Sequence, residues 1–314
     1  MKSIGGYFEL ELLRKNHFHE QALKLNSGRN CLEYILKARE YKKIYIPYFT
    51  CEVILEPIHK LGLDFQFYSI NSKLEPIFDF EIELGAAFLY TNYFGLKQNF
   101  IESLSHSISN LIIDNSQAFY AAPLMGIDTF YSARKFFGVS DGAYLYINKL
   151  IDEPLERDYS YNRMSHLLKR LDVGPEEAYS DFLDNDLSFK NEAIKGMSQL
   201  TNSILSSIDY KNVAKIRREN FLFLHSQLKE INQFKFDFKS NDVPMVYPFL
   251  VKSQNLRKNL ISNKIFVATY WPNVFDWCEK ESLEYYIAYN IIPIPIDQRY
   301  GISDMQSIVN IIKK

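Results

Sequence analysis

The sequence has few cysteines and no long apolar run. Cys31, Cys51 and Cys278 are widely spaced and form no CxxC pair. This argues against a disulfide framework and a zinc ribbon and favours a reducing, cytoplasmic location. No window approaches 18 uninterrupted apolar residues, so we expect no membrane-spanning helix. The opening MKSIGGYFELELLRK carries acidic side chains where a secretory signal needs an apolar run.

An excess of one charge and the common nucleotide motifs are also missing. The formal net charge is −2, which gives no reason to expect nucleic acid or an anionic membrane as a partner. The 12 glycines form neither GxGxxG nor GxxxxGK[ST], so nothing supports a Rossmann cofactor or a nucleoside triphosphate. His17 and His19 have a spacing that zinc tolerates, but no cysteine or further histidine lies nearby, and we expect no metal.

Short apolar runs alternate with helix-like segments over the first half of the chain. We predict helices over 27–42, 50–63 and 99–108, and strands over 43–47, 64–70, 86–95, 110–119, 129–133 and 142–148. Continuous apolar strands are typical of a sheet buried on both faces. The alternation therefore predicts an α/β fold with a parallel, helix-covered sheet.

The pattern changes beyond residue 150. A polar, helix-prone stretch over 167–200 leads into a long helix around 211–231, and the remainder is typical of a small α+β unit. A chain of 314 residues also exceeds the usual size of a single core. We predict a large α/β domain over 1–210 and a small C-terminal α+β domain over 211–314.

Polar residues stand where ligands bind in such folds, at the carboxyl ends of strands. Asp114 follows the strand that ends in LII, and Lys135 follows the strand TFYSA. Pyridoxal 5'-phosphate (PLP) needs an amine for its aldehyde, a carboxylate for its ring nitrogen and an anion site for its phosphate. Lys135 and Asp114 suit the first two needs. The helix start at residues 28–30 and the Ser132 hydroxyl suit the third.

Each of these residues also fits a purely structural role. Lys135 suits a surface position in a strand-to-loop turn, and Asp114 suits a turn or helix cap. Ser27 is a good helix N-cap whatever the helix binds. Arg134 fits an ion pair with an acidic neighbour as well as it fits a ligand contact. The spacing alone leaves these alternatives open.

Longer motifs carry a family resemblance. The segments LIIDNSQAFYA and GIDTFYSARKFFGVSDGAYLYI resemble the core motif of the DegT/DnrJ/EryC1/StrS family of sugar aminotransferases. The family's Asp-x-x-Gln matches Asp114 and Gln117, and its Lys with a following acidic-Gly pair matches Lys135, Asp141 and Gly142. LNSGRNCLEYIL, IYIPYFTCEVI, AFLYTNYFGLK and the closing YNIIPIPIDQRYGISDMQSIVNIIKK are similar to other family segments, so the resemblance covers nearly the whole chain.

The resemblance implies fold type I, with a mostly parallel seven-stranded sheet, PLP as cofactor, and a homodimer with its active site at the subunit interface. It implies transfer of an amino group, from glutamate, to a keto-sugar linked to a nucleotide, in surface polysaccharide or deoxyaminosugar synthesis. Lys135 and Asp114 would be catalytic. The implied cofactor contacts are Gly28, Arg29, Asn30, Cys51, Asp114, Gln117, Ser132 and Lys135, and the implied substrate contacts are Asn92, Tyr93, Tyr270 and Trp271.

Four positions depart from the family pattern. Phe130 stands where the family has its phosphate-binding Ser, so Ser132 takes that role. Arg29 replaces a Thr, and Cys51 replaces an aromatic that stacks on the cofactor ring. The Asn of the loop that reaches the partner subunit has no clear match, with Asn191 as the candidate. These departures keep a second hypothesis open, a degenerate homologue that binds PLP or a sugar nucleotide for regulation or scaffolding.

Overall fold

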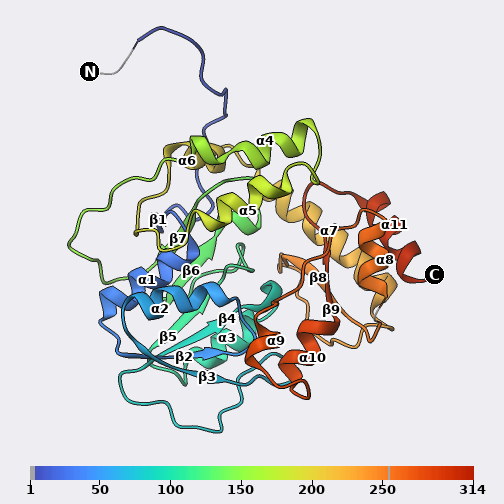
Figure 1. The fold of residues 1–314 in the computed structure, drawn as a ribbon, viewed down its shortest axis with the longest axis horizontal. Helices are drawn as coiled ribbons and strands as arrows, with labels where there is room; N and C mark the ends of the chain where they lie inside the picture. Colours follow the sequence, from blue (N-terminus) through green and yellow to red (C-terminus); the bar gives the residue numbers. More distant parts are fainter. Residues whose placement is uncertain (1–3, 254) are drawn as a thin grey trace.

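The computed structural model describes residues 4–253 and 255–314. It contains a seven-stranded sheet in the order β1-β7-β6-β5-β4-β2-β3 and a separate pair, β8 and β9 (Figure 1). The strands of the large sheet are β1 Leu23–Leu25, β2 Lys43–Pro47, β3 Asp64–Tyr68, β4 Ala87–Thr91, β5 Leu111–Asp114, β6 Asp128–Ser132 and β7 Ala143–Tyr146. The small sheet pairs β8 Val246–Leu250 with β9 Ile291–Pro295, antiparallel.

Strands β2 to β6 run parallel to one another. Strand β7 runs antiparallel to both β6 and β1. The prediction of a mostly parallel sheet is thus confirmed. The strand expected over 110–119 ends at Asp114, because the next residues turn: the Asn115 amide donates to Phe130 O, and the Ala118 amide donates to Asn115 O. Strand β1, of three residues, was not predicted.

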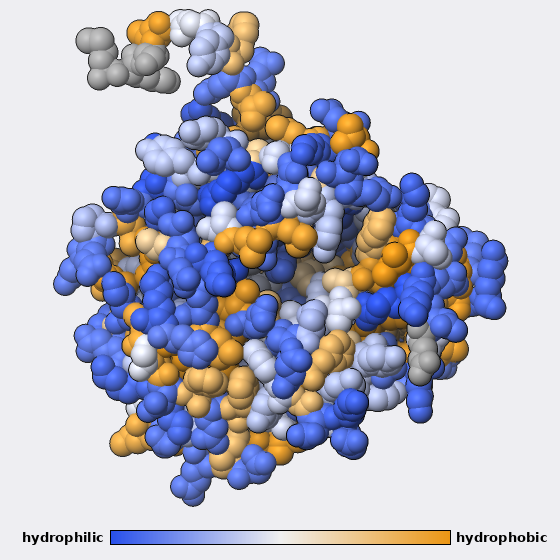
Figure 2. Space-filling view, viewed as in Figure 1, coloured by the Kyte–Doolittle hydropathy of each residue, from blue (hydrophilic) through white to orange (hydrophobic). Residues whose placement is uncertain are grey.

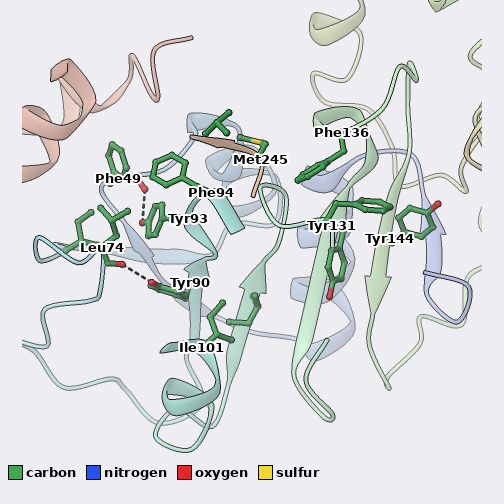
Figure 3. Packing of buried hydrophobic residues seen from close by; sticks show 14 of the residues in the cluster. Phe49, Leu74, Tyr90, Tyr93, Phe94, Ile101, Tyr131, Phe136, Tyr144 and Met245 are labelled. Carbon is green, nitrogen blue, oxygen red and sulfur yellow. Dashed lines mark hydrogen bonds between the residues drawn. The ribbon is translucent and has the colours of Figure 1, made fainter. Parts of the chain in front are cut away.

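The large sheet has one aliphatic and one aromatic face, as the period of two in a strand requires. In β4, Ala87 and Leu89 join the aliphatic cluster, whereas Phe88 and Tyr90 join the aromatic one. Strands β2 and β7 repeat the pattern, whereas β5 adds Leu111 and Ile113 to the aromatic side and Phe130 of β6 lies on the aliphatic side. Figure 3 shows part of the aromatic face, including Tyr90, Tyr131 and Tyr144. Much of the chain's 15% aromatic content therefore fills one side of the sheet.

Helix α1 (Gly28–Arg39) covers the aliphatic face with its own apolar side chains. Ser27 caps it, because its Oγ accepts the Asn30 amide at 3.3 Å. The helix expected over 50–63 is shorter: a 3-10 turn, Glu52–Ile54, leads into α2 (Leu55–Lys60). Helix α3 (Gln98–Ser105) follows β4.

The rest of the chain forms helices around the small sheet and above the large one. They are α4 Ser165–Asp172, α5 Tyr179–Leu187, α6 Gln199–Ser206, α7 Tyr210–Leu228, α8 Leu256–Ser262, α9 Val274–Trp277, α10 Leu283–Asn290 and α11 Ile302–Ile312. Strands β8 and β9 share a separate apolar cluster with α7, α8 and α11. Among the described residues, none of the helices combines the length and apolar character that crossing a bilayer requires.

Candidate active site

Three neighbouring strands of the large sheet end in polar residues at the same edge. Thr91 at the end of β4 pairs in register with Asp114 at the end of β5, and Asp114 pairs with Phe130 of β6. The last residue of β6 is Ser132, and a 3-10 turn, Ala133–Lys135, follows it directly. The parallel topology thus brings Asp114, Ser132 and Lys135 to one edge, as the sequence predicts.

The side chain of Lys135 is exposed at this edge, so a small molecule can reach its amine. The neighbouring Arg134 pairs with Asp186 of α5 at 3.0 Å, which confirms the ion-pair interpretation of Arg134. Lys135 takes part in none of the salt bridges found among the described residues. Its amine is therefore both accessible and without a carboxylate partner.

Asp114 is the buried carboxylate of the site, with its side chain 8% exposed. Burial raises its pKa, while hydrogen bonds from Ser116 and the positive charge of Lys135 oppose that rise. The Ser116 amide donates to its Oδ1 at 2.8 Å. A buried carboxylate with a raised pKa is stabilised by a cationic N–H partner. Asp114 is suited to hold such a group.

The amino terminus of α1 lies beside the turn after Asp114. A Cβ on Gly28 would lie 3.4 Å from Ser116 Oγ, so this glycine lets the helix approach the strand ends closely. Ser27 Oγ takes the Asn30 amide, and the Asn30 side chain bonds to Ser27, Glu33 and the Glu192 carbonyl. The Gly28 and Arg29 amides have no acceptor among the described residues.

The arginine at position 29 is already paired within the chain. Arg29 Nη1 lies 2.6 Å from Glu56 Oε2, and both side chains are mostly buried. The other Glu56 oxygen accepts the Asn191 amide at 2.6 Å. Glu56 therefore fixes Arg29 and the loop of Asn191 to the same place, beside the start of α1.

Hydrogen bonds from three side chains hold the backbone around this edge: those of Gln117, Asn92 and Tyr93. Gln117 Oε1 accepts the Phe94 amide at 2.9 Å, which leaves the Gln117 amide group as a donor. Asn92 donates to Asn115 Oδ1 and accepts the amide that follows the turn, and it is fully buried. The Tyr93 hydroxyl, also buried, donates to Phe49 O. Asn92 and Tyr93 follow directly after β4, and both side chains are buried.

Tyr270 and Trp271 come to the same edge from the C-terminal part of the chain. Tyr270 stacks on Phe94, with ring centroids 6.4 Å apart, and Trp271 meets Phe49 edge-on at 5.0 Å. Both side chains are half-buried. Cys51, two residues beyond Phe49, is near enough to Lys135 that the lysine charge lowers the thiol pKa, although burial raises that pKa overall.

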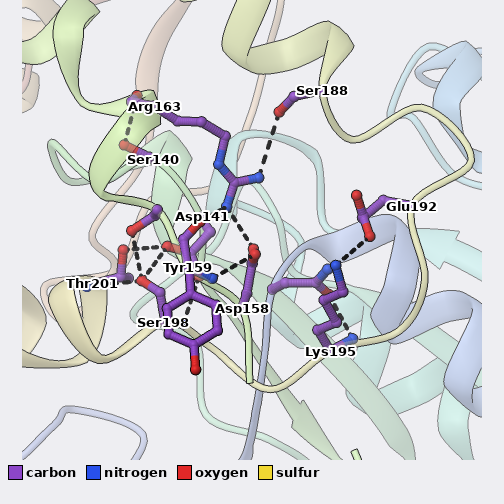
Figure 4. Close-up of polar contacts among 12 residues, drawn as sticks. Ser140, Asp141, Asp158, Tyr159, Arg163, Ser188, Glu192, Lys195, Ser198 and Thr201 are labelled. Carbon is purple, nitrogen blue, oxygen red and sulfur yellow. Dashed lines mark hydrogen bonds and ion pairs between the residues drawn. The ribbon is translucent and has the colours of Figure 1, made fainter. Parts of the chain in front are cut away.

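Asp141 and Gly142 anchor the start of β7 rather than face a ligand (Figure 4). Asp141 is fully buried and accepts hydrogen bonds from the Ser198 amide and hydroxyl and from the Thr201 hydroxyl. Gly142 has φ of +112°, and its carbonyl accepts the Ala133 amide. The pair thus fixes the backbone two residues before Lys135.

Two acidic residues beside the site were missed by the sequence analysis, Glu56 and Asp186. Burial acts to raise the pKa of Asp186, but the charges of Arg134, Lys135 and Arg29 hold it below its usual value. Neither acid lies in a motif, and each meets its arginine only through the tertiary fold. No sequence signal pointed to them.

Figure 2 shows the molecule hollowed between the large-sheet part and the β8–β9 part, on this face.

No family model and no curated protein matches the chain. Several solved structures share its fold. The sugar aminotransferase CalS13 from Micromonospora echinospora superposes with a TM-score of 0.64 at 15% identity, over 94% of this chain and 87% of the other. A PLP form of the putative sugar aminotransferase Spr1654 from Streptococcus pneumoniae gives 0.61 at 13%, over 92% and 86%.

The same fold also carries a different reaction. The GDP-4-keto-6-deoxy-D-mannose-3-dehydratase of E. coli, with hydrated PLP bound, gives a TM-score of 0.63 at 13% identity, over 92% of this chain and 87% of that one. The chain therefore has the fold of this class of PLP-dependent enzymes, which confirms the predicted fold type I. The choice between reactions depends on the residues of the site.

Proposed function

We propose that this chain is a PLP-dependent sugar aminotransferase of the DegT/DnrJ/EryC1/StrS type. The observation that carries the proposal is the set of residues at the strand ends. Lys135, an accessible and unpaired amine, lies at the same edge as Asp114, a buried carboxylate. Beside them are the Gly28 and Arg29 amides at the start of α1. These groups match the three needs of PLP.

A second observation supports the fit between these residues and PLP. Asp114 is buried, its pKa is raised, and none of the salt bridges found among the described residues includes it. The protonated nitrogen of a pyridine ring is the partner that such a carboxylate lacks. A phosphate suits the Gly28 and Arg29 amides, with the Ser132 hydroxyl, because a helix start attracts anions. Arg29 adds little net positive charge to the phosphate position, because Glu56 pairs with it.

When bound, PLP supplies an aldehyde that accepts an amine and a ring that withdraws electrons. Lys135 Nζ would hold the cofactor between turnovers. The same Nζ, when free, would be the base that accepts and returns the proton moved during amino transfer. Asp114 would keep the ring nitrogen protonated. Gln117, fixed through Phe94, would present its free amide group to the ring edge.

Glutamate as donor and a nucleotide-linked keto-sugar as acceptor are part of the proposal, in surface polysaccharide or deoxyaminosugar synthesis. Tyr270 and Trp271 are the proposed substrate contacts, because they are half-buried at the edge. Asn92 and Tyr93, which follow the end of β4, are the other two proposed substrate contacts. A lysine at 135 favours amino transfer over dehydration, since members of the family that act as dehydratases have histidine in its place.

The proposal includes a cytoplasmic homodimer with domains over 1–210 and 211–314. The buried members of the small-sheet cluster all lie beyond residue 220, which supports a separate C-terminal unit. All three cysteines are free, which supports a reducing compartment. A site completed by the partner's loop would make the isolated monomer inactive.

The test is one half of the reaction, with purified protein, PLP and L-glutamate. We expect a visible absorbance band that glutamate bleaches, with one 2-oxoglutarate released per cofactor. The Lys135→Arg variant is the matched control, because it keeps the charge but is not a nucleophile at neutral pH. It should bind PLP without the band. A band that glutamate leaves unchanged would favour the regulatory or scaffolding homologue instead.

A further inference from the structure

Arg217, on helix α7, is a buried cation without a carboxylate in contact. It is 1% exposed, and none of the arginine salt bridges found among the described residues includes it. Asp297, the acid whose charge acts on it, is bound by Arg299 at 2.7 and 3.0 Å. Burial lowers the pKa of Arg217 to about 10, which leaves it charged at neutral pH. Removing a charge from water is costly, so a cation retained at this place indicates a specific role.

The guanidinium of Arg217 joins three distant segments. Nη1 donates to Met245 O, directly before β8, at 3.1 Å, and Nε donates to Gln298 Oε1, beyond β9, at 3.1 Å. The group also lies over the Phe136 ring, 4.5 Å from its centroid. Figure 3 shows Phe136 and Met245, both of which belong to the aromatic cluster. Arg217 thus connects the small sheet to the residue that follows Lys135.

The backbone that carries Lys135 is held at both ends. We call residues 133–137 the lysine turn. Its first amide donates to Gly142 O, within the large-sheet part. Near its other end, the Phe136 carbonyl accepts Gln298 Nε2 at 2.9 Å, and Arg217 Nη2 lies 3.5 Å from the same oxygen. The C-terminal part of the chain therefore supplies the second anchor of the turn.

Arg217 also lies near Tyr270, a proposed substrate contact. Burial raises the pKa of the Tyr270 hydroxyl, and the positive charge of Arg217 opposes that rise. Tyr270 stacks on Phe94, whose amide is held by Gln117. One buried cation therefore borders both the lysine turn and the side of the site that we assign to the substrate.

We propose that Arg217 is a positioning residue for Lys135. Together with Gln298 it fixes the lysine turn, so that the Lys135 amine stays at the sheet edge beside Asp114. Attack of an amine on an aldehyde is fast only when the two groups are held in the right geometry. The inference rests on the proposed function, in which Lys135 is the reacting amine.

The shape of the guanidinium explains why an arginine stands here. Its planar fork presents several donors in fixed directions and stacks on an aromatic ring. A lysine at position 217 would keep the charge but present a single nitrogen, which cannot serve Met245 O and Gln298 in the same geometry. The C-terminal part would thus influence the reaction through the backbone of residue 136, without touching the substrate.

Amide exchange in cofactor-free protein tests the positioning without any chemistry. The Phe136 and Phe137 amides both donate to Ala133 O, at 3.0 and 2.9 Å, and report on the lysine turn. We expect the peptide spanning the turn to exchange at least tenfold faster in Arg217→Lys and in Gln298→Met than in wild type. Gln298 is only partly buried, so its variant tests the proposal even where Arg217→Lys folds poorly.

The matched control is Asn232→Ala, which removes a buried polar side chain far from the turn in the hydrogen-bond network. Asn232 is 2% exposed and holds Phe234, Pro248 and Leu250 through their backbone groups. It should lower the melting temperature and leave exchange of the lysine turn at the wild-type rate. Wild-type exchange in both test variants, or equal acceleration in the control, would overturn the proposal.

Mixing with PLP adds a spectroscopic measurement. We expect the visible band to form at least tenfold more slowly in Arg217→Lys and Gln298→Met than in wild type, and within twofold of wild type in Asn232→Ala. A band that forms at the wild-type rate in both test variants would overturn the positioning role alone. A wild-type protein that forms no band would overturn the proposed function, and the inference that rests on it as well.

Discussion

Single residues decide whether this fold can perform amino transfer. Lys135 offers an accessible amine, and Asp114 offers a carboxylate that burial has made unusually basic. Burial of the Asp114 carboxylate raises its pKa and is a cost to the cofactor-free protein, because no salt bridge found among the described residues includes it. A pyridinium partner would remove that cost. The residue thus links stability to cofactor binding.

The Asp114→Asn variant tests that link. The asparagine keeps the acceptor for the Ser116 amide. Because the folded pKa of Asp114 lies above the unfolded value of 3.8, its proton-linked stability is lost as pH rises through the folded value. The cofactor-free variant should therefore be at least as stable as wild type at pH 7, by urea unfolding. Its amino transfer should fall at least about 100-fold. A clear loss of stability with full activity would contradict this account.

The sequence predicted Asp114 and Lys135 as site residues, but it did not predict the ion pairs that lie beside them. The strand ends followed from the topology, so Asp114, Ser132 and Lys135 could be placed together in advance. Glu56 and Asp186 could not, because each meets an arginine from a distant segment and no motif marks either one. Asn92 stays a proposed substrate contact, and the sequence did not predict that its side chain donates to Asn115 Oδ1. A buried polar residue at a strand end has the same sequence pattern as an exposed one.

At the scale of elements, the start of β7 sets the position of the lysine turn. Gly142 donates its amide to Asn26 O at 2.7 Å and accepts the Ala133 amide at 3.1 Å. It therefore ties β7 both to the residue before the cap of α1 and to the turn that carries Lys135. Element types were largely predictable here. Their ends were not, because turns such as that after Asp114 depend on partners in other strands.

The Gly142→Ala variant should destabilise the fold by roughly 1–3 kcal/mol, because it places a side chain in a left-handed conformation. The added Cβ would also lie 2.8 Å from Thr201 Cγ2. The midpoint of urea unfolding measures the loss. Gly301→Ala is the matched control, since nothing lies within 4 Å of its Cβ and its φ is −118°. Equal midpoints for the two variants would show that Gly142 carries no such constraint.

At the scale of the whole molecule, the sheet edge and the hollow beside the small sheet define one site. The strand ends bring Asp114 and Lys135 together, and Tyr270 and Trp271, from the other part of the chain, pack on Phe94 and Phe49. The fold is shared with aminotransferases and with a dehydratase, so it does not itself choose the reaction. The covalent use of Lys135 is the claim on which the proposed function depends.

That claim is tested most directly by mapping where the cofactor attaches. Protein incubated with PLP is reduced with borohydride, digested, and its peptides are weighed by mass spectrometry. We predict a single pyridoxyl adduct, on the peptide that contains Lys135, and none in the Lys135→Arg variant. An adduct on another lysine, or no adduct in protein that binds PLP, would contradict the account.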